Sequence, residues 1–418
     1  ALRQARAILV VKIATHQLGG VVVTVTLNRR SLFGAAISAA VIVSAVVTGS
    51  SVLAASSPTV SATVTVGGDP RGVAITPNGS YAYVTNADDG TVSVIDTGTN
   101  QVTATVSVGS IPSRVAITPN GSYAYVTNRG DATVSVIDTG TNQVTATVTG
   151  VGITPTGVAI TPNGSYVYVP SSDDSKVYVI DTGTNSVIDT VTVGWARGGN
   201  PQQVAITPDG SYAYVTNFNG STVDVIDTAT NTVTATVSLV SRGWGGAGAA
   251  GVAITPDGST AYVAAWYAGK VDVIDTATNT VTASLSVGIA PTGVAIMPDG
   301  SYAYVSNLSS DTMSVIDTAT NQVTATVTVG DGPKYIAIAS NSSYAYVPNS
   351  YAGTVSVIKP GFAQSITFAE PSAQSLTDGS LVLSASASSS LTVSFASLTT
   401  SVCTVSGSTV TFVAAGTC

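Results

Sequence analysis

The sequence predicts an all-β protein whose main part is a seven-bladed β-propeller. A unit reading V-A-I-T-P-[ND]-G-S-Y-A-Y-V-[TS]-N, followed after a variable loop by V-S-V-I-D-T-[GA]-T-N-x-V-T-A-T-V, recurs seven times. Successive units are 42, 43, 46, 48, 42 and 42 residues apart, measured between the alanines of their opening V-A-I or I-A-I. A period near forty with several strands in each repeat is typical of propeller blades. The alanines are Ala74, Ala116, Ala159, Ala205, Ala253, Ala295 and Ala337.

Each repeat predicts four strands and two repeated turns. In the first repeat the strands are expected over residues 73–76, 81–85, 91–95 and 102–108. Pro77-Asn78-Gly79 supplies the fixed φ and the positive φ that a tight turn needs. The run from Asp96 to Asn100 predicts a second turn, in which short polar side chains bond the backbone. The aspartate of this turn recurs in six repeats and Lys359 replaces it in the seventh, so we interpret these residues as structural: Asp96, Asp138, Asp181, Asp227, Asp275 and Asp317.

A pair of tyrosines recurs on the second strand in six of the seven repeats. Tyr81 and Tyr83 show the spacing, which places both side chains on one face of the strand. We interpret this stripe as packing between blades, with the hydroxyl groups hydrogen-bonded, rather than as a binding platform. The other pairs are Tyr123 and Tyr125, Tyr166 and Tyr168, Tyr212 and Tyr214, Tyr302 and Tyr304, and Tyr344 and Tyr346.

The two ends of the repeat array predict how the propeller closes. The seventh repeat stops at Lys359-Pro360 without a fourth strand, whereas the strand sequence at 60–67 precedes the first repeat and has no blade of its own. That segment reads almost like residues 323–330, which form the fourth strand of the sixth repeat. We therefore expect an N-terminal strand to complete blade 7, which removes the exposed edge of an open array. The propeller is predicted over residues 58–360.

The repeat resembles a known family. The tetrad Y-V-T-N stands at 83–86, 125–128 and 214–217, with V-I-D-T-A-T-N following, and these motifs resemble the YVTN family of β-propeller repeats. The resemblance covers residues 59 to 360. It implies a propeller of the surface-layer or secreted bacterial or archaeal type, displayed outside the cell, and it implies no single activity.

The first 57 residues differ in composition from the rest and predict an export leader. They contain five basic and no acidic residues. Arg29 and Arg30 precede an apolar stretch over 32–47, and the small residues Ala54 and Ala55 follow, which is the layout of a secretory signal peptide. The run 28–33 also resembles a twin-arginine signal. We interpret residues 1–27 as an upstream extension without structure, and an uncleaved membrane anchor stays open as an alternative.

Beyond the leader, nine basic residues stand against 22 acidic ones, which gives a net charge of −13. Nucleic acid and anionic lipid are therefore not expected partners, because binding to phosphates needs clustered lysine and arginine. We expect an extracellular or cell-surface protein with no membrane insertion after signal cleavage. The propeller is expected to be monomeric.

A second β-domain is predicted over 361–418. Short alternating strands are expected at 365–368, 381–383, 391–395, 402–405 and 409–413, and the stretch around Cys403 together with 415–418 resembles bacterial immunoglobulin-like repeats. Such a β-sandwich needs around 100 residues, so we expect a partial domain that continues past Cys418. Cys403 and Cys418 are the only cysteines and, in an exported chain, predict a disulfide.

Residue types that support catalysis are scarce. His16 lies in the leader and Glu370 lies outside the propeller, so a histidine-ligated metal, a paired-glutamate hydrolase and a Ser-His-Asp triad are all excluded after leader removal. The pairs Asp88-Asp89 and Asp173-Asp174 provide too few oxygens for calcium, which takes six to eight. We expect no enzyme activity, no metal and no cofactor.

The variable loops are the predicted binding surface. If the repeated turns share one face of the propeller, the other connections form a second face, which also holds the two inserts that lengthen blades 3 and 4. We expect the tryptophans there to cluster with arginine and other aromatic side chains and to bind a partner. Packing of the same rings beneath the long loops is the alternative. The predicted binding residues are Trp195, Arg197, Phe218, Arg242, Trp244, Trp266 and Tyr267.

The sequence therefore predicts an exported, noncatalytic binding or surface-display protein. Its expected partner is a cell-wall glycan, a peptide or a surface protein. One alternative is a propeller enzyme, resembling a lactonase or a lyase, with a cryptic aspartate or calcium site in its channel. A structural component of a surface layer is the other alternative.

Overall fold

The computed structural model describes residues 7–13, 22–27, 40–41, 58–194, 199–240, 246–361, 366–368, 374–375, 379–387, 393–397 and 400–414. These residues form strands and turns, and none of them lies in a helix. They belong to two compact units, one of residues 58–360 and one that combines strands from 1–57 and 361–418. No helix in the described ranges is long and apolar enough to cross a membrane.

The unit of residues 58–360 consists of seven four-stranded antiparallel sheets, one for each repeat. Blades 1 and 2 contain β5 (Pro70–Ile75), β6 (Tyr81–Asn86), β7 (Thr91–Asp96), β8 (Gln101–Ser107), β9 (Pro112–Ile117), β10 (Tyr123–Asn128), β11 (Thr133–Asp138) and β12 (Gln143–Val148). Blades 3 and 4 contain β13 (Ala159–Ile160), β14 (Tyr166–Ser171), β15 (Lys176–Asp181), β16 (Ser186–Thr192), β17 (Pro201–Ile206), β18 (Tyr212–Asn217), β19 (Thr222–Asp227) and β20 (Thr232–Ser238).

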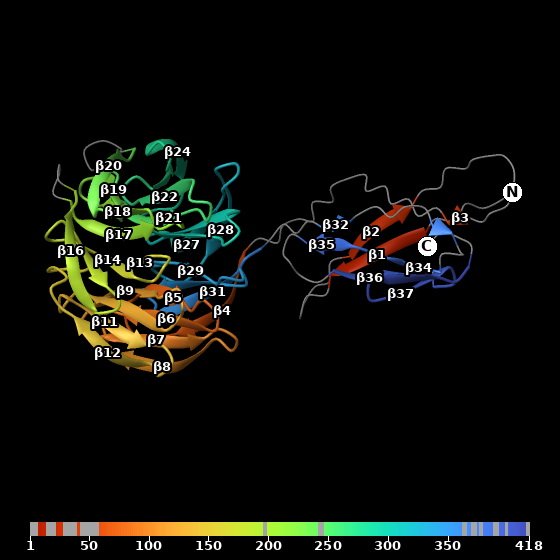
Figure 1. Cartoon of the computed structure of the whole chain (residues 1–418), viewed down its shortest axis with the longest axis horizontal. Coiled ribbons are helices and arrows are strands. Elements are labelled where there is room, and N and C mark those ends of the chain that lie inside the picture. The colour runs from red at the N-terminus through yellow and green to blue at the C-terminus, as the bar shows by residue number, and fades with distance from the viewer. Residues whose placement is uncertain are drawn as a thin grey trace. The chain divides into compact units, whose positions relative to one another are not determined.

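Blades 5 and 6 contain β21 (Ala249–Ile254), β22 (Thr260–Ala265), β23 (Lys270–Asp275), β24 (Thr280–Ser286), β25 (Pro291–Ile296), β26 (Tyr302–Asn307), β27 (Thr312–Asp317) and β28 (Gln322–Thr328). Blade 7 contains β29 (Ala337–Ile338), β30 (Ala345–Asn349), β31 (Thr354–Lys359) and β4 (Thr59–Thr65). The first strand of each blade lies at the centre of the ring and the fourth at its periphery (Figure 1).

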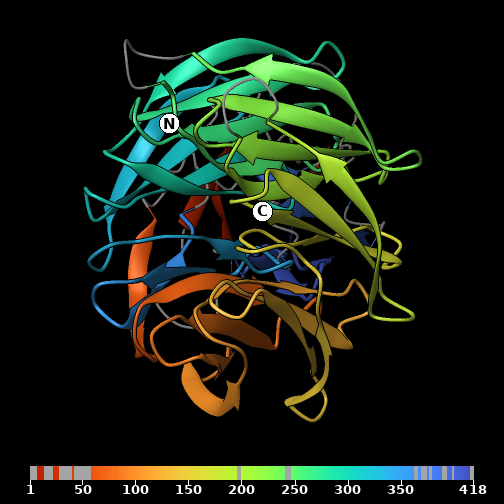
Figure 2. The same ribbon diagram turned by 90° about the vertical axis from the view of Figure 1, so that its left-hand side faces the viewer.

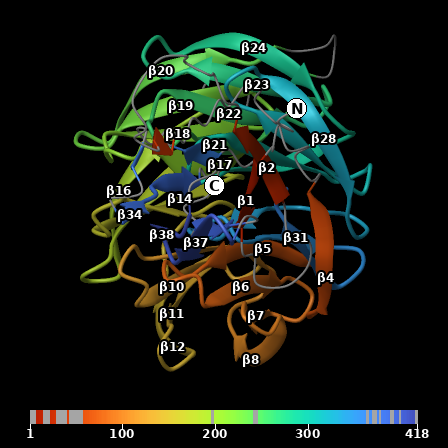
Figure 3. The ribbon, with the colours of Figure 1, turned by 90° about the vertical axis from the view of Figure 1, so that its right-hand side faces the viewer.

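The propeller closes as the sequence predicts. β4 is the outer strand of blade 7 and pairs antiparallel with β31, with Thr65 opposite Thr354 and Thr59 opposite Lys359. The red-orange β4 and the blue β31 are neighbours in the ring, although almost 300 residues of chain separate them (Figures 2 and 3). The two ends of the propeller are therefore joined in one sheet, which leaves no open edge between blades 7 and 1.

The antiparallel order separates the connections onto two faces. The P-[ND]-G and D-T-[GA]-T-N turns join strands one to two and three to four, so both lie on what we call the turn face. The connections between strands two and three, and between successive blades, lie on the opposite face, which we call the loop face. This confirms that the repeated turns share one face and the variable segments the other.

The Y-V-T-N motif joins neighbouring blades through its tyrosine. The Tyr83 ring is fully buried and its hydroxyl donates to Asn142 Oδ1 in the next blade at 2.7 Å. The same bond runs from Tyr125, Tyr168, Tyr214 and Tyr262 at 2.7 Å and from Tyr346 to Asn100 at 2.9 Å. Burial raises the pKa of Tyr83 to about 12, so the hydroxyl remains a donor. Among the described residues Tyr304 has no such acceptor, because blade 7 lacks the D-T-x-T-N turn.

In four of the six pairs, the first tyrosine is exposed and is not packed between blades as the sequence predicted. Tyr81 is 38% exposed, and Tyr123, Tyr166 and Tyr212 are exposed to a similar extent. These residues begin the second strand at the turn face, where the blades no longer cover them. In these four pairs only the second tyrosine is a buried contact between blades, whereas the partly buried Tyr344 packs against the core between blades 7 and 1.

The other polar letters of the motif also form specific bonds. Thr85 Oγ1 accepts the Gly72 amide at 2.8 Å and donates to the Ser113 carbonyl of the next blade at 3.2 Å. Asn86 Nδ2 donates to Thr91 Oγ1 and Ser93 Oγ, both at 2.9 Å, within its own blade. The motif is therefore a set of buried hydrogen bonds that hold the inner strands together.

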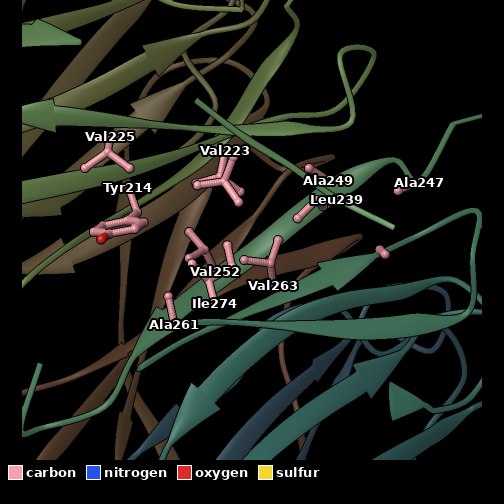
Figure 4. Close-up of a cluster of buried hydrophobic side chains, with 12 residues drawn as sticks. Tyr214, Val223, Val225, Leu239, Ala247, Ala249, Val252, Ala261, Val263 and Ile274 are labelled. Atoms are coloured by element: carbon pink, nitrogen blue, oxygen red, sulfur yellow. The ribbon is translucent and has the colours of Figure 1, made fainter. Parts of the chain in front are cut away.

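Apolar side chains fill the space between blades. Between blades 4 and 5, Tyr214, Val223 and Val225 pack against Val252, Ala261, Val263 and Ile274 (Figure 4). Successive side chains of a strand point to opposite faces of the sheet. Alternate residues therefore contact the preceding and the following blade. The remaining blades use the same positions, so the repeated sequence builds a repeated core.

The second unit contains short sheets. β34 (Ser380–Val382), β38 (Thr409–Phe412) and β37 (Cys403–Ser406) form one, and β32 (Ile366–Phe368) pairs with β35 (Ala385–Ala387). Cys403 is fully buried and disulfide-bonded. Its predicted partner, Cys418, lies outside the described residues, so the Cys403–Cys418 pairing stays a prediction, as does the immunoglobulin-like fold.

Residues 1–27 contain strands, which corrects the expectation that they lack structure. β1 (Ala7–Ile13) pairs with β2 (Val22–Leu27) and with β36 (Val393–Ser397), and β3 (Ala40–Val41) pairs with β33 (Gln374–Ser375). Both β1 and β2 are rich in valine, isoleucine and leucine, which favour strands. The second unit therefore combines strands from the N-terminal and C-terminal segments.

Candidate functional site

The loop face holds the described part of the predicted binding cluster. Trp195, Arg197, Arg242 and Trp244 lie outside the described residues. Phe218, Trp266 and Tyr267 are brought together from blades 4 and 5, with ring centroids 5.9 Å apart for Phe218 and Trp266, 5.2 Å for Phe218 and Tyr267, and 4.8 Å for Trp266 and Tyr267. We call these three residues the aromatic cluster.

The backbone of the two inserts positions the aromatic cluster. The Phe218 amide donates to the Asn200 carbonyl at 3.0 Å, and the Trp266 amide donates to the Gly248 carbonyl at 2.9 Å. A Cβ atom on Gly248 would lie 2.7 Å from Tyr267 Cδ2, so the glycine lets the insert pass directly beneath that ring. Phe218 and Trp266 are half-buried in this packing, whereas Tyr267 remains 57% exposed.

Exposed apolar side chains also occur singly in other connections of the loop face, besides Tyr267 of the aromatic cluster. Each lies in a connection at the loop ends of the strands: Ile111, Ile153, Val240, Tyr267, Ile289 and Tyr351, which are between 42% and 68% exposed. Apolar side chains spread singly over a surface do not define an interaction face, so the candidate site consists of the aromatic cluster alone.

Buried aspartates anchor the start of both inserts. Asp224 and Asp272 stand on the third strands of blades 4 and 5, where blade 1 has Ser93. Asp224 Oδ2 accepts the Gly194 amide at 2.6 Å, and Asp272 Oδ2 accepts the Val240 amide at 2.8 Å. Burial raises the pKa of Asp272 above its usual range. These carboxylates lie in third strands rather than in the central channel, so they hold loops and do not form the cryptic channel aspartate of the enzyme alternative.

The central channel is bounded by the seven first strands, which approach each other closely. Blades 1, 3, 5 and 6 have glycine at the third position of the opening segment, where a Cβ atom would collide with the backbone of the next blade. Blades 2, 4 and 7 instead have Arg114, Gln203 and Tyr335 at this position. Arg114 Nε donates to Gln203 Oε1 at 3.1 Å, and its guanidinium lies 3.0 Å from the centroid of the Tyr335 ring. The three large side chains thus meet one another across the channel.

A cluster of cations lies at the loop-face mouth of this channel, where the first strands begin. Arg71 Nη2 contacts Asp69 Oδ2 at 2.5 Å, and Lys334 Nζ lies 3.5 Å from Asp69 Oδ1. Arg114 is within electrostatic reach of both Arg71 and Lys334. We call Asp69, Arg71, Arg114 and Lys334 the channel-mouth cluster.

Burial and like charge dominate the electrostatics of the channel-mouth cluster. Desolvation lowers the pKa of Lys334 to about 8, with Arg71 acting in the same direction and Asp69 opposing it. Desolvation also lowers the pKa of Arg114, which is only 7% exposed. Arg71 holds the pKa of Asp69 below its usual range against the effect of burial. The cluster is thus positively charged and partly withdrawn from water.

The channel-mouth cluster was not among the site residues expected from the sequence. Arg71 and Lys334 are 263 residues apart in the sequence, and ring closure brings blade 7 beside blade 1. A signal for this cluster exists in the aligned repeats. The two residues that follow the opening proline, or Ala249 in blade 5, are both small in blades 3, 5 and 6, whereas they include Arg71 in blade 1, Arg114 in blade 2 and Lys334 in blade 7. These positions lie in or beside the first strands and not in the variable loops.

A cavity of about 460 Å³ lies on the turn face between blades 5 and 6. Its lining includes Thr260, Tyr262, Asp257 and Asp299. Thr260 stands where the other six blades have their half-exposed tyrosine, so the cavity opens where that ring is absent. Within the described ranges, no group of three or more histidine, cysteine, aspartate or glutamate side chains is arranged to hold a metal ion.

The fold defines a closed seven-bladed β-propeller, and comparison with known proteins agrees. The chain matches the family described as "Lactonase, 7-bladed beta-propeller" over residues 46–187 and 158–322. Together these matches cover more than half of the sequence, and the chain belongs to this family. Hydrazine synthase from Kuenenia stuttgartiensis has a similar structure at 25% identity and a TM-score of 0.64, over 71% of this chain and 97% of that one. No curated protein matches the sequence.

Proposed function

We propose that this chain is an exported, noncatalytic binding protein whose loop face engages a cell-wall glycan, a peptide or a surface protein. The aromatic cluster is the observation that carries this proposal. Aromatic side chains that are fixed by packing and still exposed are typical anchors of binding interfaces. Tyr267 is exposed while Phe218 and Trp266 pack against its ring. The cluster therefore both packs the loops together and exposes one aromatic ring to a partner.

Export is the second part of the proposal and rests on the order of basic, apolar and small residues within 28–55. The surface-layer type of the YVTN resemblance supports the same location. The low charge content of the chain, 9% of residues, agrees with a protein whose surface consists mainly of threonine, serine, asparagine and glycine.

The double substitution Trp266→Ala with Tyr267→Ala, which removes the exposed ring and one of the two rings that support it, tests the binding surface. We expect the affinity of the purified protein for isolated cell-wall fragments, measured by co-sedimentation, to fall by at least about thirtyfold, because loss of even one anchor residue costs about 2 kcal/mol or more. Tyr81→Ala is the matched control, since this tyrosine is exposed on the opposite face. Equal binding by the double variant and the wild type, or no binding by the wild type, would reject the proposal.

A lactone-hydrolysing enzyme is the second candidate function, and the family match favours it. The cations of the channel mouth are the groups in the described structure that would bind a developing negative charge. The measurement is acid release from a panel of lactones in a pH-stat. Turnover by the wild type that Arg71→Gln removes would favour the enzyme, whereas no turnover is the expected result for a noncatalytic binding protein.

A further inference from the structure

The channel-mouth cluster carries more positive charge than the protein around it neutralises. Arg71, Arg114 and Lys334 stand against Asp69 alone, and Arg129 adds a further positive field at Arg114. The side chains of Arg71, Asp69 and Lys334 are about one-fifth exposed, at 20%, 19% and 21%. Charges in such a partly dry site are costly unless they are paired.

The cations also have donors that no described residue uses. Arg114 donates from Nε to Gln203 Oε1 and from Nη1 to the Ser113 carbonyl at 3.2 Å, whereas its Nη2 has no acceptor in the described part of the chain. Lys334 Nζ contacts Asp69 at 3.5 Å as its one ion pair there. A guanidinium with an unused edge matches the geometry of a carboxylate or phosphate.

We propose that the channel mouth binds a small oxyanion with two negative charges, a dicarboxylate or a phosphate, between Arg71, Arg114 and Lys334. Two negative charges balance the excess that Asp69 leaves, and oxygen acceptors satisfy the unused donors. Tyr335 and Gln203 fix the Arg114 guanidinium in the channel before the anion arrives, so little reorganisation is needed. The site is separate from the aromatic cluster and does not depend on the proposed partner of the loop face.

Asp69 determines how strongly the site prefers a doubly charged anion to a singly charged one. Its carboxylate already occupies one side of Arg71 and approaches Lys334, so a weakly charged anion gains little by entering. A dianion interacts with all three cations. We therefore expect phosphate and malonate to bind and acetate and chloride to bind far more weakly.

Isothermal titration calorimetry of the full chain, with inorganic phosphate and with malonate at constant ionic strength in chloride, tests the proposal. We expect Arg71→Gln and Lys334→Gln each to weaken binding by about tenfold or more, because each removes a hydrogen bond to a charged group. Asp69→Asn removes the competing carboxylate and keeps its shape, so binding should tighten. Lys359→Gln, which removes an exposed cation at the end of β31, is the control and should bind like the wild type.

The pH dependence of malonate binding gives a readout that a purely structural cluster would not change. Malonate stays a dianion in alkaline solution, while Lys334 has a pKa of about 8 and faces Asp69, Arg71 and Arg114. A bound anion favours the charged ammonium, so binding should take up a proton at alkaline pH and weaken as the pH rises above about 8. Lys334→Gln should abolish this dependence.

Three results would overturn the proposal. One is the absence of a binding heat for both phosphate and malonate with the wild type. Another is equal binding by the wild type, Arg71→Gln and Lys334→Gln. The third is equal binding of chloride and the dianions, which would show that the cluster attracts counterions without a site. If phosphate binds and malonate does not, the site selects the tetrahedral oxyanion, and the reverse result identifies the dicarboxylate.

Discussion

Deletion of residues 59–66 should prevent the propeller from folding to a soluble protein. This segment contains β4, which pairs along the whole of β31. Its loss would uncover Val355 and Val357, which are fully buried, and would leave the edge of β31 unpaired. Val64 also packs in the apolar cluster between blades 7 and 1, so the deletion would weaken the closing contact of the ring. An unpaired strand edge of this kind favours aggregation.

Circular dichroism and size-exclusion chromatography of the deletion variant measure the effect. A soluble, monomeric and cooperatively folded deletion variant would contradict the role of β4. The matched control moves the same strand to the other end of the propeller, after Ile358, joined by the D-T-A-T-N turn of blade 6. This variant should fold, because the strand occupies the same place from the opposite chain end. The added asparagine would also supply the acceptor that Tyr304 lacks among the described residues.

Most of the propeller could be predicted because its contacts repeat. The sequence at 60–67 matches residues 323–330, and this likeness was sufficient to place β4 in blade 7. A position that recurs in every blade, such as the buried Tyr83, meets the same neighbours each time. The alternation of the strands then determines which side chains fill the core.

Features that occur once could not be predicted in the same way. The channel gathers one short segment from every blade, and the neighbours across it depend on ring closure rather than on sequence distance. Arg114, from blade 2, therefore meets Tyr335 from blade 7, which a comparison of adjacent repeats does not show. The strands β1 and β2 were missed for another reason: an apolar, basic N-terminal segment has the composition of a leader as well as that of a strand.

The aromatic cluster lies between these two cases. Its three residues lie in the connections between strands two and three of blades 4 and 5, which were expected on the variable face, and they pack against one another. The expected cluster with the tryptophans and arginines of the inserts stays a prediction, because those residues lie outside the described ranges. Whether the rings bind a partner depends on their exposure, which no residue pattern gives. In the structure Tyr267 is exposed although the rings of Phe218 and Trp266 and the backbone at Gly248 all lie close to its ring.

Gly293→Ala should destabilise the propeller by about 3 kcal/mol, because the inner strands of blades 6 and 7 leave no space for a methyl group. A Cβ atom there would lie 2.5 Å from the Lys334 carbonyl oxygen and 2.7 Å from Tyr335 Cα. Both are backbone atoms, so no side chain can rotate away. The backbone of Gly293 is outside the left-handed region, so the effect would come from crowding alone.

Gly98→Ala is the matched control for this crowding. The nearest atom to its added Cβ is Asp96 Oδ1 at 3.4 Å, and blades 4, 5 and 6 already have alanine at the equivalent position of the turn. We expect the control to unfold at the same denaturant concentration as the wild type, while Gly293→Ala unfolds at a clearly lower one. Equal unfolding midpoints for the two variants would mean that the first strands of blades 6 and 7 move apart at little cost in stability. A lower midpoint for Gly293→Ala alone would show that the close approach of the first strands limits the stability of the whole ring.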